Sequence, residues 1–118
     1  MRSRKGTPEW ARLAAAVVGL FGWEFFLDSQ NQPFWRQGVV YIGEMMFGFT
    51  LADLIWYAVG RQSLTRWQVL VSAAAVLVWP LAIAVAALTG LDRDGCAVAA
   101  AALTILARLL TTPQSPDA

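Results

Sequence analysis

The stretch from Gly43 to Gly60, GEMMFGFTLADLIWYAVG, decides how the rest of the chain is interpreted. It approaches the length of a membrane-spanning helix, which needs about 20 residues to cross a hydrocarbon core of about 30 Å. It is nearly all apolar, and yet it contains the two acids Glu44 and Asp53. Because hydrocarbon penalises charge, each of these acids must be protonated, paired with a cation or directed into a polar interior.

The composition of the whole chain also points to a bilayer. Of the 118 residues, 58% are hydrophobic and only 14% are charged. A soluble domain of this size would have far less apolar surface to bury. The net charge of +1 gives no general attraction to nucleic acid. We therefore expect an all-α, polytopic protein of the inner (plasma) membrane that is surrounded by lipid and has no nucleic-acid partner.

Four hydrophobic segments are expected to form transmembrane helices, at about residues 10–28, 34–60, 67–89 and 95–111. The last segment is short and rich in alanine, and Asp92 to Gly95 is expected to form the tight turn before it. Residues 1–111 then make a single four-helix domain. Residues 112–118, which are polar and contain two prolines, are expected to be disordered.

The lysine and arginine residues predict the orientation. With four spans, seven of the nine lie on one side of the membrane and two on the other. The larger set is Arg2, Arg4, Lys5, Arg12, Arg61, Arg66 and Arg108, and the smaller set is Arg36 and Arg93. Because cytoplasmic loops are enriched in basic residues, both termini are expected to be cytoplasmic. A three-span topology would move the C-terminal end to the outer side and fits this rule less well.

The two acids of the second segment are expected to lie in different parts of the bundle. Nine positions separate Glu44 from Asp53, which puts them on opposite faces of a helix and about 13.5 Å apart along its axis. On ideal helices, Glu44 reaches the height of Glu24, Trp23 and Trp79 in the outer half of the membrane. The sequence therefore predicts a cluster of acids and tryptophans there.

Asp53 is expected to lie closer to the inner boundary, near the level of Thr104 and above Arg12 and Arg108. Two interpretations stay open. Asp53 is either a structural partner of one of these arginines, since intramembrane acids are usually paired, or a substrate-binding residue together with Tyr57.

Glu24 and Glu44 are the candidate catalytic residues, and Trp23 and Trp79 are candidate substrate-binding residues. Two carboxyl groups that share one site do not both ionise easily, so one would retain a proton and could donate it. The simpler alternative for Glu24 is that it lies close enough to the boundary to be hydrated. The chain has no histidine and a single cysteine, so we expect no metal site and no cofactor.

Several short patterns between about residues 20 and 70 are shared with a known family. They are Trp23-Glu24-Phe25, Arg36-Gln37-Gly38-Val39 at the start of the next segment, and then Asp53, Tyr57 and Trp67. In these patterns the chain resembles the integral-membrane terpene cyclases of meroterpenoid and indole-diterpene pathways. The resemblance implies a metal-independent isomerase in which Glu24 protonates an isoprenoid substrate. Tryptophan faces would stabilise the resulting cation.

The chain also departs from that family. Its members are longer, and the second acid of their later helices has no counterpart here. The asparagine that usually precedes the tryptophan–glutamate pair is replaced by Leu20-Phe21-Gly22, and Glu44 matches no family position. A thinner similarity links the chain to the small lycopene cyclase subunits, whose Pro-x-Glu-Glu signature is replaced by Tyr41-Ile42-Gly43-Glu44.

Other functions stay open at the level of sequence. One alternative is an accessory or assembly subunit of a larger membrane complex. Another is a proton-coupled small transporter, because the length, the span count and an acid in the first segment are similar to the small multidrug resistance family. A phage-type holin fits less well, since the chain ends in a polar tail without basic residues. An accessory subunit would have partner subunits, and a transporter would form a homo-oligomer. A cyclase would bind an isoprenoid.

Overall fold

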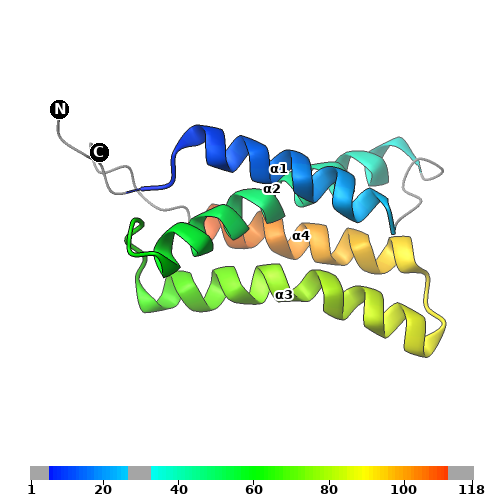
Figure 1. The fold of residues 1–118 in the computed structure, drawn as a ribbon. Helices are drawn as coiled ribbons and strands as arrows, with labels where there is room; N and C mark the ends of the chain where they lie inside the picture. The colour runs from blue at the N-terminus through cyan, green and yellow to red at the C-terminus, as the bar shows by residue number, and fades with distance from the viewer. Residues whose placement is uncertain (1–5, 27–32, 112–118) are drawn as a thin grey trace.

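The computed structural model describes residues 6–26 and 33–111 of the chain. These residues form four α-helices and no β-strand (Figure 1). The helices are α1 (Glu9–Glu24), α2 (Phe34–Ala58), α3 (Arg66–Thr89) and α4 (Arg93–Thr111). The prediction of an all-α chain is confirmed, and the predicted disorder of residues 112–118 lies outside the described residues.

The four helices run alternately up and down in one bundle, and α2 contacts all three of the others (Figure 1). α1 packs on α2, while α4 packs against both α2 and α3. The end of α1, the start of α2 and the connection from α3 to α4 lie at one end of the bundle. The start of α1 and the connection from α2 to α3 lie at the other end. The stretch that carries Glu44 and Asp53 is therefore the central element.

Three of the helices, α2, α3 and α4, are long and apolar enough to span a membrane, which indicates a multi-pass membrane protein. The prediction for the first segment needs correction, because α1 has 16 residues and ends at Glu24. A turn follows at Phe25 and Phe26, and residues 27 and 28 of the predicted segment lie outside the described residues.

The ends of α3 and α4 follow from local side-chain chemistry. Thr65 caps α3 by accepting a hydrogen bond from the Gln68 amide at 3.1 Å, and the Gln68 side chain accepts one from the Thr65 amide at 2.9 Å. Gly90 ends α3 in the left-handed region at φ 75°. The predicted turn at Asp92–Gly95 lies too far along the chain. The Asp92 carboxylate accepts from the Asp94 amide at 3.3 Å, which caps α4 and lets it begin at Arg93.

Two glycines let α2 approach its neighbours closely. A Cβ at Gly43 would overlap Ala101 of α4 and press on Trp79 of α3. A Cβ at Gly48 would overlap the backbone of α1. Because five positions rotate a helix by about 140°, these glycines serve different neighbours and not one stripe.

We expect Gly43→Ala to lower the free energy of unfolding by about 1–3 kcal/mol, because the added methyl group must displace Ala101 or Trp79. Gly38→Ala in the same helix is the control, since a Cβ there meets no atom within 4 Å. That variant should be neutral or stabilised by up to about 1 kcal/mol. Thermal unfolding of both variants in the same detergent measures the difference, and equal midpoints would contradict the packing described for α2.

Candidate functional site

Glu44 is buried in the interior of the bundle with 0% of its surface exposed. Its carboxyl group lies within hydrogen-bonding reach of the Glu24 carboxyl group at the end of α1. Within the described part of the chain, no backbone, amide or hydroxyl donor bonds to either Glu44 oxygen. Two carboxylates have no hydrogen to share, so a bond between the two groups requires a proton on at least one of them. The structure thus places the two predicted acids in one site.

Three aromatic rings pack together beside this acid pair. Trp23 stacks on Trp79, with ring centroids 5.5 Å apart and planes inclined by 28°. Phe47 meets the two indoles edge-on, at 5.5 Å from Trp23 and 6.0 Å from Trp79. The rings come from α1, α3 and α2 respectively, so the predicted cluster of acids and tryptophans is assembled from three helices.

Trp79 is held in place by a polar bond inside the bundle. Its indole N–H donates to the Thr104 hydroxyl at 2.8 Å, and that hydroxyl donates to the Ala100 carbonyl at 2.8 Å. Both side chains are almost completely buried. The expectation from helix heights that Thr104 lies near the level of Asp53 is corrected, because the Thr104 hydroxyl bonds to Trp79. The bond fixes the indole face that stacks on Trp23.

An open pocket of about 230 Å³ lies next to the aromatic rings. Its lining is apolar and consists of Val18, Gly19, Gly22, Trp23, Phe26 and Phe47. Val18 and Phe26 are more than half exposed, so the pocket opens on the outer surface of the bundle. Sequence reasoning missed this pocket, although two glycines three positions apart before a tryptophan were a signal for it.

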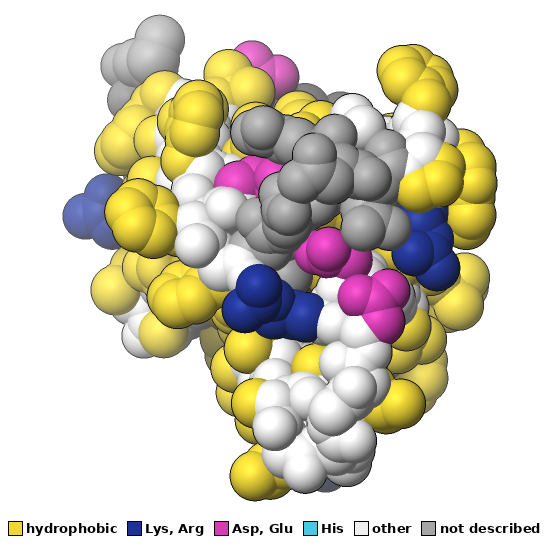
Figure 2. Space-filling view, turned by 90° about the vertical axis from the view of Figure 1, so that its right-hand side faces the viewer, with side chains coloured by type: hydrophobic (Ala, Val, Ile, Leu, Met, Phe, Trp, Pro, Cys, Tyr) yellow, Lys and Arg dark blue, Asp and Glu magenta, His cyan; other side chains and the backbone are white. Residues whose placement is uncertain are grey.

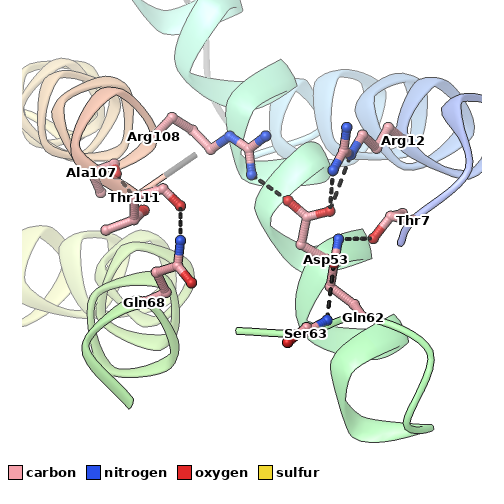
Figure 3. Close-up of polar contacts among 9 residues, drawn as sticks. All are labelled: Thr7, Arg12, Asp53, Gln62, Ser63, Gln68, Ala107, Arg108 and Thr111. Carbon is pink, nitrogen blue, oxygen red and sulfur yellow. Dashed lines mark hydrogen bonds and ion pairs between the residues drawn. The ribbon is translucent and has the colours of Figure 1, made fainter. Parts of the chain in front are cut away.

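Asp53 forms the centre of a second polar cluster, which Figure 3 shows. It is 1% exposed and contacts two arginines. Arg12 donates to Oδ1 from Nε and from Nη2, both at 3.0 Å, and Nη1 of Arg108 donates to Oδ2. The predicted pairing with Arg12 or Arg108 is confirmed, and both arginines take part. The cluster joins α1, α2 and α4.

The predicted site residues therefore fall into two groups. Glu24, Glu44, Trp23 and Trp79 lie together, whereas Asp53 belongs to the arginine cluster farther along α2. Tyr57 lies one turn beyond Asp53 and is 41% exposed, away from the acid pair. The distance along α2 from Glu44 to Asp53 is about 13.5 Å, too far for one small substrate group to contact both.

Among the described residues, no three carboxylate or thiol side chains are grouped so that they could hold a metal ion. No protein-family model matches this chain, and neither a curated protein nor a solved structure is found to match it. The resemblance to the membrane terpene cyclases accordingly stays a prediction.

We expect Asp53→Leu to lower the free energy of unfolding by about 3 kcal/mol, because it removes the shared partner of two arginines inside the bundle. The double variant Asp53→Leu, Arg108→Leu should recover much of this loss, since Arg108 is the more buried of the two, with 11% of its side chain exposed. Arg66 is an exposed arginine at the same end of the bundle. Adding Arg66→Leu to Asp53→Leu should therefore recover none of the lost stability. A fully stable Asp53→Leu protein would show that the cluster is not structural.

Proposed function

We propose that the chain crosses the membrane four times, with both termini in the cytoplasm and the bundle in the inner (plasma) membrane. At 1.5 Å per residue, α1 is about 24 Å long, close to the thickness of the hydrocarbon core. Its outward side chains are apolar, with Leu13, Val17, Val18 and Phe21 all more than half exposed. This surface suits lipid and supports a fourth span.

The charges of the described residues support the orientation. Four arginines, Arg12, Arg61, Arg66 and Arg108, lie toward the end of the bundle where α1 begins, and two, Arg36 and Arg93, lie toward the other (Figure 1). The first end also carries aromatic side chains typical of a membrane interface, with Trp10 packed edge-on to Trp56 at 5.8 Å. The positive-inside rule makes this end cytoplasmic.

Reporter fusions test this topology. We expect a reporter fused after Ala118 to be cytoplasmic and one inserted beside Asp92, in the connection between α3 and α4, to be external. Fusion activities that place both reporters on the same side of the membrane would contradict the four-span arrangement.

We propose further that the acid pair protonates an apolar isoprenoid lipid, as in a metal-independent terpene cyclisation. The observation that carries this proposal is the contact of two carboxyl groups, one of them fully buried, beside three packed aromatic rings. A carboxylic acid kept neutral inside a bundle can deliver its proton to an alkene, and indole faces stabilise the carbocation that forms.

Glu24 is the more accessible acid of the pair. It is partly exposed, whereas Glu44 is fully buried. The residues Trp23 and Phe26, on either side of Glu24 in sequence, line the open pocket. At about 230 Å³ the pocket is smaller than the roughly 300–1,000 Å³ of typical small-molecule sites, so it suits one end of an isoprenoid whose remainder stays in the bilayer.

The reaction balances without an external reagent. The Glu24 proton forms a C–H bond with a terminal alkene carbon, and a second alkene of the same molecule closes the ring on the cation. Loss of a proton from the cyclised cation to the Glu24 carboxylate restores the acid, so the overall change is an isomerisation. While Glu24 is a carboxylate, a proton on Glu44 can hydrogen bond to it and stabilise it.

We expect Glu24→Gln to lower turnover by at least about 100-fold while the fold persists, because glutamine keeps the shape but has no acidic proton. Glu44→Gln should lower turnover less, since Glu44 acts on Glu24 and not on the substrate. Glu9→Gln, an exposed acid of α1 outside the cluster, is the matched control. The measurement is conversion of a polyene or prenylated lipid by the purified protein, followed by mass spectrometry.

The outcomes separate the competing functions. A Glu24→Gln protein that still converts the lipid contradicts the assignment of the donor. A parent protein that neither converts nor retains any such lipid, and that co-purifies with other subunits, points instead to an accessory role. Proton-coupled transport that either amide variant uncouples from pH would favour a transporter, because the buried acid pair could also bind and release a transported proton.

A further inference from the structure

In the arginine cluster at the other end of α2, Arg12 has a guanidinium N–H group that does not contact Asp53. Two guanidinium groups contact the single carboxylate of Asp53. Both arginines keep their positive charge at any physiological pH. Arg12 directs Nε and Nη2 to one oxygen of Asp53, and its Nη1 forms no hydrogen bond or ion pair with a described residue. In Figure 3 this Nη1 points away from Asp53.

Arg12 is accessible from outside the bundle. Its side chain is 28% exposed, compared with 1% for Asp53. The outer edge of its guanidinium is the kind of planar, two-donor surface that binds phosphate oxygens in pairs. A ligand could therefore bind Arg12 without breaking its bonds to Asp53.

Arg12 lies close to aromatic rings of the kind found at the level of lipid headgroups. It follows Trp10 by two residues, and Trp10 packs against Trp56, so both aromatic rings mark the interface at this end. The start of α1 is also anchored there. The Gly6 amide donates to the Arg61 carbonyl at 2.6 Å, and the Gln62 side chain donates to the Thr7 hydroxyl at 3.1 Å (Figure 3).

The charge of this end favours an anion. Its described charged residues are four arginines (Arg12, Arg61, Arg66 and Arg108) and two acids (Glu9 and Asp53). The opposite end has the reverse balance, with the acids Glu24, Glu44, Asp92 and Asp94 and the arginines Arg36 and Arg93. Figure 2 shows that opposite end, where acidic and basic side chains gather together near the middle and hydrophobic side chains surround them.

We propose that Arg12 binds the phosphate group of an anionic phospholipid at this end of the bundle, with Arg108 adding positive charge across their shared Asp53. Asp53 has two effects in this site. Its carboxylate holds both guanidinium groups in position, and it also competes with the phosphate for them. The site is separate from the acid pair and does not depend on the chemistry proposed there.

Native mass spectrometry of the protein released from mixed phosphatidylglycerol and phosphatidylcholine nanodiscs tests the proposal. The parent should retain phosphatidylglycerol in preference to phosphatidylcholine, and Arg12→Gln should lower that preference about fivefold, as expected for one phosphate-contacting arginine. Arg12→Gln leaves Asp53 paired with Arg108, so the bundle should persist. Arg66→Gln, which removes an exposed arginine of the same end, should change the preference little. Equal preferences in the parent and Arg12→Gln would overturn the proposal.

Asp53→Asn gives an independent test, because it removes the competing carboxylate and nearly keeps the shape. It should raise the retention of phosphatidylglycerol, and its thermal unfolding midpoint should fall less in phosphatidylglycerol nanodiscs than in phosphatidylcholine ones. The same drop in both lipids would contradict a shared site. Inorganic phosphate added to the parent in phosphatidylcholine nanodiscs distinguishes the source of the ligand. If it stabilises the parent as much as phosphatidylglycerol does, the ligand is a free phosphate and the lipid assignment is wrong.

Discussion

The cost of placing a carboxyl group in hydrocarbon governs the arrangement of this bundle. α2 carries Glu44 and Asp53, and each must be kept from lipid by something that neutralises it or gives it a polar neighbour. The two acids point in different directions from α2, so each contacts different residues of the neighbouring helices. Glu44 meets α1 at Glu24, and Asp53 meets α1 and α4 through Arg12 and Arg108.

The two acids are neutralised in physically different ways. Asp53 is held by arginines, which keep their charge, so its neutralisation is permanent and suits a structural role. Glu44 has a second carboxyl group as its polar neighbour, so the pair depends on a proton, which can leave and return. Exchangeable protons support chemistry and transport, and for this reason the proposed function is placed at Glu24 and Glu44. The stacked face of Trp23 and the pocket beside it place an apolar surface next to that proton.

Much of the fold could be predicted from sequence, because long apolar segments and heights along ideal helices depend on spacing alone. Those heights predicted that Glu24, Glu44, Trp23 and Trp79 lie at one level. They also predicted that Asp53 lies near Arg12 and Arg108. They do not say in which direction a side chain points, and so the bond from Trp79 to Thr104 was missed. The pocket was missed because it arises where Gly22 leaves space, and hydrophobic patterns record only the side chains that are present. The start of α4 was placed too late because Asp92 acts as a cap.

If at least one of Glu24 and Glu44 keeps a proton, infrared spectroscopy of the carboxyl C=O stretch in membranes at neutral pH should detect it. We expect a band from a protonated carboxyl group in the parent protein. Replacing either acid by Gln should shift this band, because the carboxyl group that remains loses its carboxyl partner. A parent spectrum without a protonated carboxyl band, or a band that is unchanged in both variants, would show that Glu24 and Glu44 do not share a proton.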